Sequence, residues 1–193
     1  WETSILILGT FNPEDTYATG NQADFFYQRP RNYFWPVLPT LYNHNGIERG
    51  DMLAQQNFLR EKGIGLTDIL RTIVDADQEN VDHVNAISSF KDDQIDKQFN
   101  EFLWNTDAII KYIQENKIEE VYFTRLGNIQ EVNPNLNTFE YQIRQVENYC
   151  TDQSVYHTRL HSPTGMGLGE GERIPTLRQR WIENGFLDHT QNE

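Results

Sequence analysis

The chain has 193 residues and a formal net charge of −13 at pH 7, which argues against broad electrostatic attraction to nucleic acid but allows a local basic face. Its length and its 12% aromatic content suit a single domain over residues 1–193, and no apolar run approaches the roughly 20 residues that span a membrane. Cys150 is the only cysteine, which excludes an intramolecular disulfide and a thiolate cluster and suits a cytoplasmic protein. We also expect a monomer.

The first predicted strand and the loop behind it carry the strongest functional signal. Residues 5–8 are four aliphatic side chains, closed by Gly9 and then by Pro13, which predicts a strand buried on both faces that ends in a turn. The polar loop from Gly9 to about Arg31 therefore leaves the carboxyl end of an interior strand, where open α/β sheets place their ligands. Loops of this length are usually binding loops or disordered, and the aromatic side chains within 24–35 argue against disorder.

Apolar spacing and helix-breaking residues predict the helices. Residues 99–113 carry apolar side chains at helical spacing, with a break near 105–106, where Thr106 is a candidate cap. Gly63 and Gly185 follow the ends of two other helical patterns. The predicted helices are 33–42, 51–62, 99–113 and 173–184.

Shorter runs predict the remaining strands, at residues 121–123 and 155–161. Residues 64–69 fit an extended stretch or turn, and 75–96 fit a connecting region with one short buried strand or helix near 84–87. The alternation of helix and strand predicts an α/β fold, with a mainly parallel sheet and helices on both faces. We expect the loops that start at Gly9 and His161 to border one crevice at the same end of this sheet.

Four segments in order resemble motifs of the uracil-DNA glycosylase superfamily: residues 9–13 (GTFNP), 20–27 (GNQADFFY), 29–35 (RPRNYFW) and 161–163 (HSP). Within it, residues 30–35 and 63–70 (GIGLTDIL) are most similar to the hypoxanthine-DNA glycosylase and mismatch-specific branches. The resemblance implies a three-layer α/β/α sandwich with a central, mainly parallel four-stranded sheet. It also implies hydrolysis of the N-glycosidic bond of uracil, hypoxanthine or mismatched thymine, flipped out of DNA, without a cofactor.

The resemblance assigns Asn12 to the attacking water. Breaking an N-glycosidic bond requires a flipped base, a water below the anomeric carbon, and donors that accept charge on the departing base. An amide holds a water but cannot be its base at neutral pH, so Asn12 would act by positioning; alternatively, it braces the turn before Pro13. Further substrate contacts are expected from the same loop and from two aromatic side chains that would stack on the base: Gly9, Thr10, Phe11, Pro13, Phe26 and Tyr27.

Two further candidates for catalysis are Asn32 and His161. Asn32 would contact the base or the water, or else its buried side chain satisfies loop backbone groups. His161 would donate a hydrogen bond to a carbonyl oxygen of the leaving base. Alternatively, His157 and His161, four residues apart on one strand face, are packing residues. A zinc site is disfavoured because no third ligand has the expected spacing, so we expect no metal.

Contacts to DNA are expected from both loops, through Arg29, Arg31, Ser162, Thr164, Gly165 and Met166. The hydroxyls would bind phosphate, and Met166 or Leu168 would act as a wedge in the base stack. A glycosylase further requires an electropositive rim, for which Arg159 and Arg173 are additional candidates. A hydrolase of the Gly-x-Ser-x-Gly type is disfavoured because the chain has no such elbow.

Three departures from the family pattern leave the excised base undetermined. The branch that excises uracil best has an acidic residue where this chain has Asn12. The family's base-reading Asn has no counterpart at the end of strand 121–123, which runs into Thr124 and Arg125, and the segment 161–163 lacks one residue of His-Pro-Ser-Pro. The alternative is a catalytically silent member of the fold that binds nucleotide, nucleic acid or a protein partner, which a uniformly acidic crevice would favour.

Overall fold

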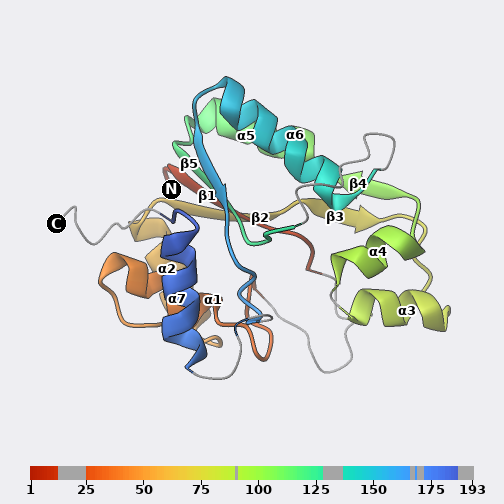
Figure 1. Ribbon diagram of the computed structural model, residues 1–193, viewed down its shortest axis with the longest axis horizontal. Coiled ribbons are helices and arrows are strands. Elements are labelled where there is room, and N and C mark those ends of the chain that lie inside the picture. The colour runs from red at the N-terminus through yellow and green to blue at the C-terminus, as the bar shows by residue number, and fades with distance from the viewer. Residues whose placement is uncertain (13–24, 90, 128–136, 166–167, 169–171, 187–193) are drawn as a thin grey trace.

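A four-stranded parallel sheet in the order β2-β1-β5-β6 forms the centre of the computed structural model (Figure 1). The structure describes residues 1–12, 25–89, 91–127, 137–165, 168 and 172–186. All four strands run the same way, so their carboxyl ends share one edge of the sheet. The strands are β1 (Ile5–Gly9), β2 (Ile64–Asp68), β5 (Glu120–Phe123) and β6 (Tyr156–Arg159).

Helices cover both faces of this sheet, which confirms the predicted three-layer arrangement. On one face lie α5 (Thr106–Asn116) and α6 (Phe139–Asp152); on the other lie α1 (Phe34–Val37), the 3₁₀ helix η2 (Leu38–Tyr42), α2 (Met52–Glu61) and α7 (Arg173–Glu183) (Figure 1). Strand β1 contributes to both cores: Leu6 and Leu8 pack under α5 and α6, and Ile5 and Ile7 pack on the opposite side. This two-sided burial explains the continuous aliphatic run.

A second, smaller layer lies beside the carboxyl end of β2. Strands β3 (Leu70–Ile73) and β4 (Phe102–Trp104) pair antiparallel, and α3 (Val81–Ser88) and α4 (Asp92–Gln98) lie next to them (Figure 1). The predicted helix over 99–113 is therefore wrong in its first part. Phe99 follows the end of α4 and only residues 102–104 form β4, and over so short a stretch apolar spacing does not distinguish a strand from a helix.

The helix N-terminus at this point also differs from the prediction. Helix α5 begins at Thr106, and the capping position belongs to Asn105. The Asn105 side chain donates instead to the backbone carbonyl of Asp68 at 2.9 Å, and the Thr106 hydroxyl donates to Gln142 at 2.5 Å. Both side chains thus connect α5 to neighbouring elements.

The other predicted elements are present, but some begin or end at residues other than those predicted. Residues 64–68 are the edge strand β2, and residues 84–87 belong to α3. The predicted helix over 33–42 is divided into α1 and η2 near Pro39, which lacks a backbone donor. Helix α6 has no counterpart among the predicted helices. Its N-terminus is capped by Thr138, whose hydroxyl accepts a hydrogen bond from the Tyr141 amide at 3.3 Å.

No helix among the described residues is long and apolar enough to cross a membrane.

Candidate functional site

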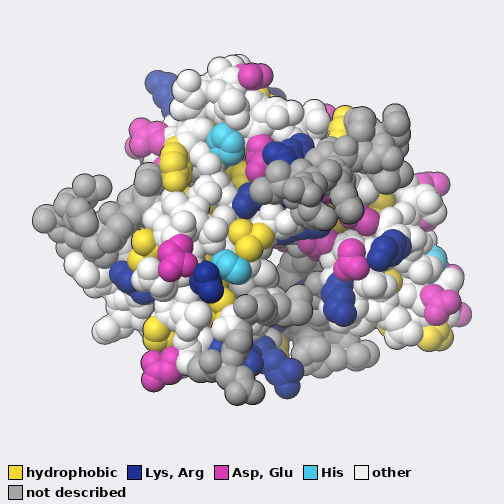
Figure 2. Space-filling model, in the orientation of Figure 1, with side chains coloured by type: hydrophobic (Ala, Val, Ile, Leu, Met, Phe, Trp, Pro, Cys, Tyr) yellow, Lys and Arg dark blue, Asp and Glu magenta, His cyan; other side chains and the backbone are white. Residues whose placement is uncertain are grey.

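A cavity of about 750 Å³ opens at the carboxyl ends of the parallel strands. Its wall includes Thr10, Phe11 and Asn12 from the loop after β1, and Ser162, Pro163 and Thr164 from the loop after β6. Strand β5 separates β1 from β6, yet both loops reach the same cavity because all these strands are parallel. The expected convergence of the two loops is therefore present, and Figure 2 shows a hollow near the middle of this face of the molecule.

Further residues of the cavity wall come from the segment before α1 and from the start of α4. Phe26, Tyr27, Arg29, Arg31 and Asn32 line the cavity, together with residues 91–93. The Tyr33 amide donates to the Pro163 carbonyl at 2.8 Å, which fixes the segment before α1 against the loop after β6. Residues that lie more than 130 positions apart in the chain thus form one site.

Gly9, Asp68 and Tyr27 meet at the floor of the cavity. A Cβ atom on Gly9 would lie 2.1 Å from Asp68 Oδ1 and 3.0 Å from the Tyr27 hydroxyl. Two strand ends and the aromatic segment therefore approach so closely that only glycine fits between them. The loop that carries Asn12 starts at this point of contact.

We expect Gly9→Ala to destabilise the protein by about 1–3 kcal/mol, because the added methyl group would overpack the contact with Asp68 and Tyr27. Urea denaturation measures the effect. Gly50→Ala is a matched control, since a Cβ on Gly50 would meet no atom within 4 Å. Equal stability of the two variants would contradict the close packing at Gly9.

Asp68 lines the cavity but is not among the residues predicted from the sequence, and the same holds for Lys91, Asp92 and Asp93. Burial raises the pKa of the Asp68 carboxyl to about 7, an effect that Arg29 opposes and Asp92 reinforces. Burial also lowers the pKa of Arg29, to about 10, so that Arg29 remains charged at neutral pH. The segment 63–70 was recognised in the sequence as family-like, but its Asp was not singled out, because its burial depends on the pairing of β2 with β1.

Tyr27 has a rigid setting in the cavity wall. Its ring stacks on Phe34 with centroids 3.9 Å apart, and its backbone is left-handed, with φ 59°. The Thr124 hydroxyl donates to the Leu8 carbonyl at 3.2 Å, so the Tyr27 hydroxyl is the donor in the 3.1 Å bond between Tyr27 and Thr124. Burial and the neighbouring Asp68 raise the pKa of Tyr27, so the hydroxyl remains protonated.

The other residues predicted to contact the substrate differ in their hydrogen bonds, packing and exposure. Phe26 accepts a hydrogen bond from Trp35 Nε1 at 2.7 Å through its carbonyl oxygen. The Thr10 hydroxyl bonds to Asp92, and Phe11 packs partly into the core under α5 and α6. Asn12 is exposed at the cavity. Pro13 lies outside the described residues.

The Asn32 side chain is buried and satisfies a backbone group, which is the structural alternative to a catalytic role. Its buried Oδ1 accepts from the Phe34 amide at 2.9 Å, which positions the start of α1, while the residue also borders the cavity. His161 is not among the described residues that line the cavity. Its carbonyl accepts from Trp181 Nε1 at 2.8 Å, and burial together with Arg180 lowers the pKa of its ring.

The residues predicted to bind DNA lie partly at the cavity. Arg31 is exposed there, and Ser162 and Thr164, whose hydroxyls lie 3.0 Å apart, also line the cavity. Gly165 has φ 73°, and a Cβ there would lie 3.0 Å from the Tyr33 ring. Met166 lies outside the described residues.

Charges of both signs surround the cavity (Figure 2). Arg29, Arg31, Lys91 and Arg125 contribute positive charge. The carboxyls of Asp68, Asp92 and Asp93 line the same space, and Arg125 donates to Asp92 at 2.9 Å. The crevice is therefore not uniformly acidic.

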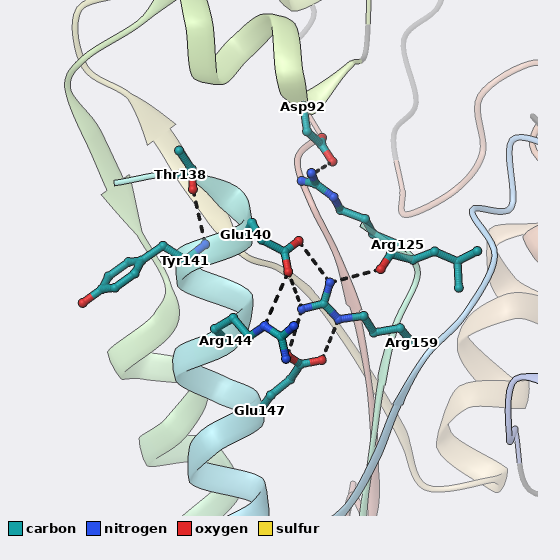
Figure 3. A network of polar contacts seen from close by, with 9 residues as sticks. Asp92, Arg125, Thr138, Glu140, Tyr141, Arg144, Glu147 and Arg159 are labelled. Carbon is teal, nitrogen blue, oxygen red and sulfur yellow. Dashed lines mark hydrogen bonds and ion pairs between the residues drawn. The ribbon is translucent and has the colours of Figure 1, made fainter. Parts of the chain in front are cut away.

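The prediction that Arg159 belongs to a basic rim is wrong. Arg159 is buried on β6 and forms ion pairs with Glu147 at 2.6 Å and Glu140 at 2.7 Å, both on α6 (Figure 3). It also donates to the Leu126 carbonyl at 3.1 Å. Arg173 is exposed and donates to the Tyr33 hydroxyl at 3.3 Å, outside the cavity lining. Side chains alternate between the two faces of a strand, and Arg159 lies on the face of β6 that packs against α6.

Among the described residues, no group of three or more His, Cys, Asp or Glu side chains is arranged to hold a metal ion. A scan against protein-family models and a search of curated proteins each found no match for this chain.

Proposed function

We propose that the protein is a DNA glycosylase that hydrolyses the N-glycosidic bond of a damaged or deaminated base flipped into the cavity. The observation that carries this proposal is the convergence of Asn12, Tyr27 and the loop 162–164 on one cavity of about 750 Å³. Ligand pockets for small molecules have volumes of about 300–1,000 Å³, so a base and its sugar fit. All of these residues except Thr164 belong to the segments that resemble the uracil-DNA glycosylase superfamily.

In this proposal, the cavity wall replaces the stacking that the base loses on leaving the duplex. Flipping costs a few kcal/mol, and stacking on an aromatic ring contributes about 1–3 kcal/mol. The Tyr27 ring stacks on Phe34, so its position is fixed before a base binds. Asn12 would hold a water against the anomeric carbon, and the catalytic effect would come from its position.

Exposed cations beside the cavity would contact the phosphates of the bound strand. We expect Arg31→Ala to weaken DNA binding across sequences and to reduce the slope of log affinity against log salt by about one. Both Arg and Ala carry a Cβ, so the left-handed backbone at residue 31, with φ 63°, is equally strained in the variant. Fluorescence anisotropy over a salt series measures the slope.

Arg71→Ala is the matched control for this measurement, because Arg71 is exposed on β3 and does not line the cavity. A slope that falls equally in both variants, or in neither, would contradict a phosphate contact at Arg31.

The function is tested with labelled oligonucleotides that contain uracil, hypoxanthine or a mismatched thymine, in single and double strands. Alkali cleaves the strand at each abasic site, so cleavage reports base release. The second candidate is a catalytically silent member of the fold. It is favoured by the position of His161, the expected donor to the leaving base, which is not among the described residues that line the cavity. Binding of an oligonucleotide or nucleotide without cleavage of any substrate would favour this candidate.

A further inference from the structure

The geometry points to Asp68 as the proton donor to the leaving base, a role that rests on the proposed function. Asp68 ends β2, the edge strand next to β1, and its carboxyl lies over the start of the loop that carries Asn12. One point, the place that a Cβ on Gly9 would occupy, lies 2.1 Å from Asp68 Oδ1 and 3.0 Å from the Tyr27 hydroxyl. A base that stacks beside Tyr27 is therefore within reach of this carboxyl.

The surroundings of Asp68 favour its protonated form. Arg29 faces it from the segment before α1 and favours the carboxylate, while burial and Asp92 at the start of α4 favour the acid. The Tyr27 hydroxyl next to it is neutral. The balance gives a pKa of about 7, so a large fraction of the carboxyl carries a proton at neutral pH, whereas an ordinary Asp with a pKa of about 3.9 would carry almost none. General acids work best when their pKa lies near the working pH.

The proposed step balances as a hydrolysis. The bond between C1′ and the base nitrogen breaks, and its electron pair passes to the base. The Asp68 proton moves to a ring nitrogen of the base, which leaves as a neutral molecule. The water held by Asn12 forms the new C1′–O bond and loses a proton to solvent, and the Asp68 carboxylate then regains a proton from solvent.

This chemistry favours a purine such as hypoxanthine over uracil. A purine has unprotonated ring nitrogens, N3 and N7, that can take a proton during departure. Uracil has no such ring nitrogen and leaves as an anion, which hydrogen-bond donors stabilise without proton transfer. Asp68 should therefore matter more for excision of hypoxanthine than for excision of uracil.

Single-turnover rates of base release from about pH 5 to pH 9 test this role. For the intact protein on hypoxanthine, we expect the rate to fall about tenfold per pH unit above pH 7, as Asp68 loses its proton. Asp68→Asn should lower the hypoxanthine rate by about 10² to 10³-fold and abolish this alkaline limb, with a much smaller loss on uracil. Asp152→Asn, which removes one charge at the exposed end of α6, is the matched control.

Thermal unfolding gives an independent readout of the Asp68 environment. Because folding raises the pKa of Asp68, the folded state binds more protons than the unfolded state between about pH 4 and 7, and stability falls as pH rises through that window. Asp68→Asn should therefore raise the melting temperature relative to the intact protein at pH 8 but not at about pH 4. A difference that does not change with pH would contradict the raised pKa and with it the proposed acid.

The outcomes separate this role from the proposed function. An intact protein that releases hypoxanthine with no rate change around pH 7, or an Asp68→Asn variant with an unchanged hypoxanthine rate, would overturn the role of Asp68 and leave the glycosylase activity intact. An equal loss on hypoxanthine and uracil would do the same. If the intact protein releases no base at all, the proposed function fails and the role of Asp68 fails with it.

Discussion

Replacing Asn12 with Ala is expected to lower the rate of base release by about 10² to 10³-fold, while affinity for DNA stays within about twofold. Asn12 is exposed at the cavity, so its loss leaves the packing of β1 unchanged. In the proposed mechanism its amide contacts the attacking water and not the DNA, so its loss lowers the rate and leaves binding of the DNA nearly unchanged. Single-turnover kinetics and anisotropy measure the two quantities separately.

Asn57→Ala, on the exposed side of α2, is the matched control for this comparison. Asn12→Asp should retain or exceed the intact activity on uracil and add an acidic limb to its pH profile. A carboxylate attracts the developing oxocarbenium ion only when it is ionised, so activity should fall below the ordinary Asp pKa of about 3.9. A fully active Asn12→Ala protein would exclude a role for this residue in holding the water.

Replacing Arg159 with Ala is expected to lower the free energy of unfolding by about 3–5 kcal/mol. The substitution would remove the guanidinium that bonds at 2.6 to 3.0 Å to Glu140 and Glu147, both buried on α6 (Figure 3). Arg144 would remain, at the longer distances of 3.2 Å from Glu147 and 3.6 Å from Glu140. The substitution would also remove the donor to the Leu126 carbonyl, which ties the loop after β5 to this pair. Urea denaturation measures the loss.

Arg180→Ala provides the comparison, because Arg180 pairs with Glu183 at 3.3 Å on the exposed surface of α7. Exposed ion pairs contribute about 0–1 kcal/mol, so this variant should be nearly as stable as the intact protein. If Arg159→Ala instead kept its stability and lost affinity for DNA, the residue would belong to the rim after all.

The sequence was sufficient to predict the layers of the fold and the end of the sheet where the cavity lies. The aliphatic run of β1 indicated a strand buried on both faces, and the alternation of helix and strand indicated a parallel sheet, whose strand ends necessarily share one edge. The β3–β4 pair was missed because residues 102–104 are few and their spacing also fits a helix. The edge strand β2 was recognised only as extended.

Site residues in loops next to recognisable elements could be predicted from the sequence. Properties of the site that depend on packing between distant elements could not. Asn12, Tyr27 and Thr164 lie in loops that follow or precede recognisable elements, and all three reach the cavity. The raised pKa of Asp68 comes from its burial and from Asp92, against the effect of Arg29, and no local pattern encodes this environment. His161 was assigned by its motif, but its carbonyl bonds to Trp181 on α7 and its residue lies outside the cavity lining.

Release of free base from an oligonucleotide, identified by mass spectrometry, tests the glycosylase proposal most directly. We expect the intact protein to release uracil, hypoxanthine or thymine from its substrate and to leave an abasic sugar whose new oxygen comes from labelled water. The Asn12→Ala protein, folded and able to bind the same oligonucleotide, should release almost none. An intact protein that binds these oligonucleotides but releases no base from any of them would contradict the proposal that this cavity hydrolyses the N-glycosidic bond.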